Sequence, residues 1–159
     1  RLSENQLAAF RQRHIGFVFQ SYNLLPFMTS VENVAMPLMF RGESKRKRTR
    51  MAVAMLKKVG LGNRLKHYPR QMSGGQQQRV GIARAFVAKP DVVFADEPTG
   101  NLDSKTTVEV MDMIKSFARK FNQTIVLVTH DPELAKYADR IVTLVDGRIV
   151  SDTKGENHE

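Results

Sequence analysis

The stretch Val92-Val93-Phe94-Ala95-Asp96-Glu97-Pro98 decides the fold class of this chain. Four apolar residues follow Pro90-Asp91 and run directly into two adjacent carboxylates. A short, continuous apolar run of this kind indicates a strand buried on both faces, as in a parallel sheet. Because open α/β sheets bind ligands beyond the carboxyl ends of their strands, Asp96 and Glu97 stand where a site is expected.

Two acids at such a position suit a metal site. Mg²⁺ prefers oxygen ligands and is often bound through only one or two carboxylates. A neighbouring acid can then position or deprotonate a water molecule. The alternative is a strand that ends in a solvated acidic turn, and this stretch alone does not separate the two interpretations.

The composition is ordinary for a globular domain, with 159 residues, 42% hydrophobic and 26% charged, which is enough chain to bury a sizeable core. No apolar run approaches the roughly 18 residues that a membrane-spanning helix requires, and no secretory signal is visible. The chain has no cysteine. This excludes disulfides and fits a reducing compartment.

The net charge of +9 is concentrated in one segment. Residues 41–70 hold 11 of the 25 Lys and Arg and a single acid, Glu43, so this segment carries +10 and the remainder of the chain −1. Such a basic segment can meet nucleic acid or anionic lipid. It is equally compatible with a solvated helix face, so both interpretations stay open.

Alternating strand and helix patterns cover most of the chain. The predicted strands are Ile15–Phe19, Val92–Ala95, Thr124–Thr129, Ile141–Val145 and Arg148–Val150. The first predicted helix begins at Ser3, and a short one follows Asp131-Pro132. The other predicted helices are Val31–Phe40, interrupted at Pro37, Met51–Val59, Arg79–Ala85 and Ser104–Phe121.

Three finer expectations accompany this pattern. The strand at Thr124–Thr129 is expected to be buried, and the last two strands flank Asp146-Gly147, a strong hairpin signal. The polar tail from Ser151 is expected to be frayed. The buried side of the helix at Ser104–Phe121 is expected to carry Val108, Met111, Ile114, Phe117 and Phe121.

The run Ser73-Gly74-Gly75-Gln76 lies just before a predicted helix. Ser73 and Gln76 have the spacing of a capping box. A serine hydroxyl, the N–H groups of two residues without side chains, and the positive end of a helix dipole together favour an anion site. The alternative is a capped helix with a flexible entry, because glycine-rich turns are common.

Together these motifs resemble those of an ABC-type ATPase subunit, in the same order, from about Arg13 to Val150. The resemblance is carried by Gln20 after a strand, Met72–Gln76, Val92–Glu97, Asn101–Asp103 and Thr129–Asp131. Two stretches, Phe19–Pro26 and Asp96–Asp103, resemble the sequences of one subgroup of this family. That subgroup serves lipoprotein release, macrolide export and related peptide or cell-division complexes. We call Met72–Gln76 the signature run. Met72 stands where this family usually has leucine, a residue of similar volume, so little effect is expected.

The resemblance implies an α/β fold: a P-loop NTPase (RecA-like) core with a parallel sheet, plus an inserted helical subdomain. Residues 1–20 would belong to the core, residues 21–88 would form the helical subdomain with the signature run, and residues 89–159 would complete the core. The phosphate-cradling P-loop, Gly-x-x-x-x-Gly-Lys-Ser/Thr, and the adenine-stacking aromatic residue upstream of it are missing from the 159 residues. Both are expected before Arg1, so the chain is expected to be truncated there and inactive alone.

The resemblance also implies roles in ATP hydrolysis. Glu97 would be the general base for the attacking water, and Asp96 would support Mg²⁺ through water. Gln20 would contact the metal and sense the γ-phosphate of ATP. His130 would hydrogen-bond that phosphate or orient the water; a lone histidine is usually structural, but its place after a predicted strand favours function.

By the same resemblance, the signature run acts across a dimer. Ser73, Gly74 and Gly75, with Gln76 completing the nucleotide-binding run, would bind the γ-phosphate of an ATP held by a second subunit. Asp103 would connect the two sites. ATP would join the subunits and hydrolysis would release them, because the γ-phosphate contacts exist only in the closed state.

The implied partners are a second ATPase subunit, in a homodimer, and integral membrane permease subunits at the cytoplasmic face of the inner membrane. Residues 21–88 would grip the permease, and nucleic acid is not an expected partner. A DNA-repair or chromosome-structuring ATPase shares the signature but inserts a long coiled coil, whereas Gln20 and Ser73 are only 53 residues apart. A non-hydrolysing dimerisation or binding module is the other alternative, and the transported substrate cannot be read from the chain.

Overall fold

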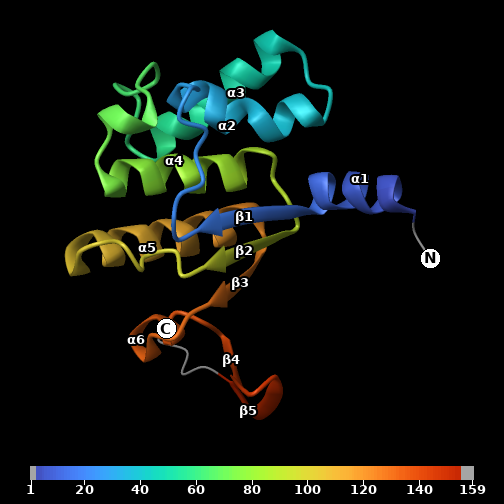
Figure 1. Cartoon of the computed structure of the whole chain (residues 1–159), viewed down its shortest axis with the longest axis vertical. Coiled ribbons are helices and arrows are strands. Elements are labelled where there is room, and N and C mark those ends of the chain that lie inside the picture. The colour runs from blue at the N-terminus through green and yellow to red at the C-terminus, as the bar shows by residue number, and fades with distance from the viewer. Residues whose placement is uncertain (1–2, 155–159) are drawn as a thin grey trace.

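A computed structural model describes residues 3–154, which form a three-stranded parallel sheet, a separate hairpin and a set of helices (Figure 1). The parallel sheet has the order β1-β2-β3, with β1 at Ile15–Phe19, β2 at Val92–Asp96 and β3 at Thr124–Val128. The antiparallel hairpin joins β4 (Arg140–Val145) to β5 (Arg148–Lys154). The predicted α/β class with a parallel sheet is confirmed.

The helices between β1 and β2 gather on one side of the sheet in Figure 1. The helical elements are α1 (Glu4–His14), α2 (Ser30–Phe40), α3 (Lys45–Lys58), the 3₁₀ turn η1 (Pro69–Gln71), α4 (Gly74–Val87), α5 (Ser104–Phe121) and α6 (Pro132–Ala135). The helical segment expected within residues 21–88 is therefore present, and its boundaries as a subdomain stay a prediction. No helix within residues 3–154 combines the length and apolar character needed to cross a bilayer.

Helix starts follow the capping residues closely. The capping box predicted from Ser73 to Gln76 is formed, and the helix predicted to begin at Ser3 starts with a second capping box between Ser3 and Gln6. Helix α3 begins well before the predicted Met51, because the Ser44 hydroxyl accepts from the Lys47 N–H at 3.4 Å and starts the helix there. Unbranched Lys and Arg side chains lose little freedom in a helix, so the basic run continues it.

The core lies between the sheet and the helices that cover it. Helix α4 approaches β1 so closely that a Cβ atom at Gly16 would lie 2.7 Å from the Ala85 carbonyl oxygen, which explains the glycine. Helix α5 packs against α4 through Phe86 and Phe117, whose ring centroids are 5.4 Å apart. Val93 of β2 is fully buried in this core.

The expectation that β2 is buried on both faces, and that β3 is buried, was wrong. Val93 and Ala95 are fully buried, but alternate residues point to the opposite face of the sheet. On that face Phe17 is 43% and Val128 52% exposed. Within residues 3–154 the helices cover one face only and β3 forms an edge, so the second apolar face has little covering.

Three smaller expectations were also wrong. Pro37 does not interrupt α2: the helix continues through it to Phe40 and loses only the one hydrogen bond that the missing N–H of Pro37 would make. Val108 is exposed and Val110 is buried instead, since two positions along a helix differ by about 200°. Residues from Ser151 to Lys154 are not frayed but extend β5, where the Asp152 carboxylate pairs with Arg140 of β4 at 2.6 Å. Residues 155–159 of the predicted tail lie outside the described residues.

Candidate functional site

The carboxyl ends of the three parallel strands stop at the same level. Phe19 of β1 is in register with Asp96 of β2, and Asp96 with Val128 of β3. The residues that follow each strand therefore start from one edge of the sheet, where ligands of such sheets bind. These following residues include Gln20, Glu97 and His130, three of the predicted site residues.

Glu97 is the centre of the polar contacts at this edge. Its Oε1 accepts the backbone N–H of His130 at 2.8 Å and lies 2.6 Å from His130 Nδ1, and its Oε2 accepts the Thr129 hydroxyl at 3.1 Å. Its own N–H donates to the Val128 carbonyl at 2.9 Å. The structure thus brings together the two predicted catalytic side chains, and adds Thr129, whose role the sequence interpretation missed.

The backbone of Glu97 has a φ of +43°, which non-glycine residues rarely adopt. The left-handed conformation costs about 1–2 kcal/mol for a residue with a Cβ atom. Such conformations persist where the surroundings hold them, and they cluster at functional sites. At Glu97 the hydrogen bonds to Val128, Thr129 and His130 maintain this conformation.

Two opposing effects act on the Glu97 carboxyl. Burial raises its pKa, because desolvation disfavours the charged form, but the hydrogen bonds from His130 and Thr129 stabilise the carboxylate. The net result is a pKa of Glu97 below its ordinary value. Since a carboxylate only accepts, His130 Nδ1 carries the proton in this contact.

Gln20 lies against the loop that follows β2. A Cβ atom at Gly100 would be 2.6 Å from Gln20 Nε2, so glycine leaves room for the glutamine side chain. The Asn101 side-chain amide donates to the Gln20 carbonyl at 3.1 Å. Asp96 is exposed beside this loop, so Gln20 and Asp96, the predicted metal residues, come from adjacent strand ends.

The Ser73–Gln76 run forms the start of α4. Ser73 Oγ accepts the Gln76 N–H at 3.3 Å, and Gln76 Oε1 accepts the Ser73 N–H at 3.2 Å. The first N–H groups of a helix have no partner inside it, so those of Gly74 and Gly75 remain available to an anion. The anion-site interpretation and the capped-helix interpretation are therefore compatible here.

Both glycines of the signature run are needed for packing as well. A Cβ atom at Gly74 would lie 2.7 Å from the Tyr22 hydroxyl, and one at Gly75 would lie 2.9 Å from Thr106 Cγ2. Tyr22 lies two residues after Gln20, so the helix start and the loop after β1 touch. Among the hydrogen bonds of residues 3–154, none joins the Ser73–Gln76 run directly to Glu97 or His130.

Asp103 begins α5. Its carboxylate accepts the Thr106 N–H at 3.0 Å and the Thr106 hydroxyl at 2.6 Å, and these bonds hold the pKa of Asp103 below its usual range. Since Thr106 also touches Gly75, the start of α5 lies beside the start of α4. Asp103 is thus a helix cap in this chain, and its expected role across a dimer stays a prediction.

Comparison with known proteins gives consistent matches. Residues 2–100 match the family model described as ABC transporter. The chain is 51% identical over 149 residues to the uncharacterized ABC transporter ATP-binding protein MJ1508 of Methanocaldococcus jannaschii, covering 94% of this chain and 66% of the relative. It is also 51% identical over 152 residues to the lipoprotein-releasing system ATP-binding protein LolD of Geobacter metallireducens, covering 96% of this chain and 68% of the relative.

A third relative is longer, and a solved structure also matches. The macrolide export ATP-binding/permease protein MacB of Pasteurella multocida is 49% identical over 152 residues, which covers 96% of this chain and 23% of the relative. The dimeric post-hydrolysis structure of the ATP-binding cassette MJ0796, bound to ADP and Pi, matches with a TM-score of 0.86 at 40% identity, covering 99% of this chain and 69% of that one. The chain thus spans about two thirds of the length of MJ1508, LolD and MJ0796.

Proposed function

The chain belongs to the ABC transporter ATP-binding family, and we propose that it works in an ATPase subunit that dimerises on ATP and drives transport or extraction by membrane subunits. The resemblance inferred from the motifs, including that to lipoprotein-release and macrolide-export proteins, is confirmed by these relatives. The predicted P-loop NTPase type of fold is confirmed by the match to the MJ0796 cassette.

The proposal is carried by one observation: Glu97 and His130 are in contact at the carboxyl edge of the parallel sheet, and Gln20 follows the adjacent strand at the same edge. Phosphoryl transfer asks a protein mainly for positioning and charge neutralisation. In the proposed reaction a water oxygen forms a bond to the γ-phosphorus, the bond from that phosphorus to the β–γ bridging oxygen breaks, and the Glu97 carboxylate takes the water proton. With a pKa below its ordinary value, Glu97 is a carboxylate at neutral pH and can accept the proton.

Mg²⁺ fits the oxygen donors at this edge. The described residues hold no group of three or more His, Cys, Asp or Glu side chains suited to a metal. Mg²⁺ does not need one, since it is commonly bound by one or two carboxylates together with substrate phosphates and water. Asp96 and Gln20 would hold it, and when bound it supplies neutralisation of phosphate charge.

The start of α4 is proposed to act in trans. Ser73, Gly74 and Gly75 would bind the γ-phosphate of the ATP on a second copy, with the N–H groups of the two glycines as donors. Asp103 at the start of α5 would connect the two sites. The proposed cellular setting is the cytoplasmic face of the inner membrane, with permease subunits contacting the helical segment.

No Gly-x-x-x-x-Gly-Lys-Ser/Thr motif occurs in the 159 residues. Tests of hydrolysis therefore use what we call the P-loop-bearing protein: residues 1–159 joined at the N-terminus to the P-loop segment of an ABC ATPase. We expect it to release phosphate from Mg-ATP and to form an ATP-dependent dimer.

The decisive variant is Glu97→Gln in the P-loop-bearing protein. Gln keeps the shape of the side chain but cannot take the proton, so hydrolysis should fall by about 10²-fold or more while ATP binding is retained. Phosphate release and gel filtration with ATP measure the two effects, and the variant should accumulate as a dimer. Turnover at the parent rate in Glu97→Gln would remove Glu97 from the role of base.

A further inference from the structure

Gln78 of α4 is fully buried, although nothing in the proposed chemistry uses it. Its Nε2 donates to the backbone carbonyl of Pro98, the residue directly after Glu97. Its Oε1 is buried without a hydrogen-bond partner. A buried amide with an unpaired oxygen is unfavourable compared with an apolar side chain of the same shape, so what matters about Gln78 is which backbone it contacts.

Arg84 lies six residues after Gln78 on α4. It makes a similar contact with the loop that follows β1. It is 8% exposed, and its Nη1 and Nη2 donate to the carbonyls of Asn23 and Tyr22 at 2.6 and 2.9 Å. These two residues follow Gln20 closely. Burial lowers the pKa of Arg84, because desolvation disfavours the charged guanidinium.

The backbones that Gln78 and Arg84 hold are in or beside unusual conformations. Tyr22 and Asn23 have φ values of 60° and 46°, and Glu97 has 43°. Left-handed conformations at residues with side chains persist only when surrounding contacts maintain them. One helix, α4, supplies contacts of this kind to both loops.

We propose that Gln78 and Arg84 are positioning residues that tie the helix presenting Ser73, Gly74 and Gly75 to the loops that carry Glu97 and Gln20. The inference rests on the proposed function and deepens it. Anion binding at the start of α4 would shift that helix, and the two buried contacts would carry the shift to the base and to the glutamine. The same helix would therefore report occupancy by the partner's nucleotide to this chain's own catalytic residues.

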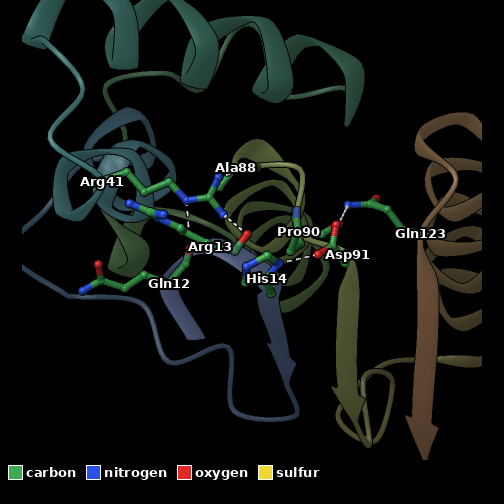
Figure 2. Close-up of polar contacts among 8 residues, drawn as sticks. All are labelled: Gln12, Arg13, His14, Arg41, Ala88, Pro90, Asp91 and Gln123. Carbon is green, nitrogen blue, oxygen red and sulfur yellow. Dashed lines mark hydrogen bonds and ion pairs between the residues drawn. The ribbon is translucent and has the colours of Figure 1, made fainter. Parts of the chain in front are cut away.

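The chain offers a matched control for each residue at the opposite edge of the sheet (Figure 2). Gln123 also donates its Nε2 to a proline carbonyl, that of Pro90, at 2.5 Å, and its Oε1 is also buried without a partner. Arg41 also binds backbone carbonyls only: those of Gln12, Arg13 and Ala88, at 2.8, 2.6 and 2.6 Å.

The first test compares Gln78→Met with Gln123→Met in the P-loop-bearing protein. Methionine keeps the volume and removes both the donor and the unpaired oxygen, so neither variant should lower the melting temperature strongly. Gln78→Met should lower kcat for ATP by about 10- to 100-fold, as misplaced catalytic groups do, and change KM little. Gln123→Met should keep the parent kcat. Equal kcat values in the two variants would overturn the proposal.

Gln78→Glu provides a second variant if methionine disturbs folding. A protonated carboxyl can donate to the Pro98 carbonyl, whereas a carboxylate cannot. Burial raises the pKa of such a carboxyl. The activity of Gln78→Glu should therefore fall as the pH rises, along a descending limb that the parent lacks. A purely structural role predicts no new limb, and its absence would count against the positioning role.

The second test compares Arg84→Lys with Arg41→Lys. Lysine keeps the positive charge but lacks the planar fork of N–H donors with which arginine binds two or three carbonyls at once. Amide hydrogen exchange is read at residues 20–23 and 97–102 of the P-loop-bearing protein. Arg84→Lys should increase exchange in the first segment and Gln78→Met in the second, whereas the control variants should change neither. This readout does not need turnover: an inactive parent would refute the proposed function alone, while unchanged exchange in both segments would refute the positioning role.

Discussion

At the scale of single residues, the contacts with the residues at the end of β3 fix both the backbone and the side chain of Glu97. Its backbone is strained, its side chain is only 18% exposed, and its partner His130 is 87% exposed. The exposed imidazole is therefore free to contact a ligand with its other nitrogen while Nδ1 holds the carboxylate. Such a pair would suit the proposed role, with a carboxylate held in place beside a polar group that a phosphate or water can reach.

The lowered pKa of Glu97 gives a prediction for stability against pH. A carboxyl whose pKa is lower in the folded than in the unfolded state stabilises the fold above its unfolded pKa, and loses that contribution as the pH falls through the folded value. The difference in unfolding free energy between the P-loop-bearing protein and its Glu97→Gln variant should be largest above about pH 5 and shrink below it. Urea titrations from pH 7 to pH 3 measure this, and a constant difference would contradict the cited contacts.

At the scale of elements, α3 combines an ordinary buried side with an unusual charge. The helix holds seven Lys and Arg and no acid. Within the described part of the chain, only one of these cations forms an ion pair: Lys47 pairs with Glu43 at 2.8 Å. Four of these cations occupy residues 45–48, in the first turn, where the helix dipole disfavours positive charge. Apart from the contacts of Lys47 and Arg48 with Glu43, the cations of this turn do not help the stability of the helix.

Replacing Lys45, Arg46, Lys47 and Arg48 together by Gln therefore provides a clean test of a membrane role. The gain at the helix dipole and the loss of the exposed contacts with Glu43 oppose each other, so α3 should keep its stability and a loss of binding reports charge. Each cation near an anionic bilayer contributes about 1 kcal/mol, so affinity for anionic vesicles should fall by more than tenfold.

The matched control replaces Lys105, Lys115, Arg119 and Lys120 of α5 by Gln, since these cations lie on a different helix. Co-sedimentation with anionic and with neutral vesicles compares the two variants and the parent. If both variants keep the binding of the parent, the cations of α3 are a solvated face and nothing more.

At the scale of the whole molecule, two apolar surfaces are exposed among residues 3–154. One is the second face of the parallel sheet, with Phe17 and Val128. The other is the β4–β5 hairpin, which lies apart from the parallel sheet and exposes Leu144 and Ile149 (Figure 1). Exposed apolar strands with unpaired edges are templates for pairing with another chain.

We therefore predict that the 159 residues by themselves self-associate and bind Mg-ATP at best weakly, because they contain no P-loop to hold the β- and γ-phosphates. Light scattering alongside titration with a fluorescent nucleotide measures both properties. Val128→Lys, which puts a charge on the open face at the β3 edge, should reduce the scattering. A monodisperse monomer that binds Mg-ATP at micromolar concentration and hydrolyses it would contradict the prediction.

The sequence by itself determined the elements and the motifs of this protein. Local chemistry is sufficient there: a serine caps a helix at Ser73, Asp146-Gly147 turns a hairpin, and an apolar run makes β2. It also indicated Glu97 and His130 separately, because residues that follow neighbouring strands of one parallel sheet lie at one edge.

Only the tertiary structure decided which face of each element is covered and which distant groups meet. Burial of β2 on a single face depends on where α4 and α5 pack, which no periodicity within β2 encodes. The contacts of Gln78 with Pro98 and of Arg84 with Tyr22 join residues 20 and 62 positions apart. Such contacts exist because folding places a helix against two loops, and a buried polar side chain then needs whatever backbone partner lies beside it.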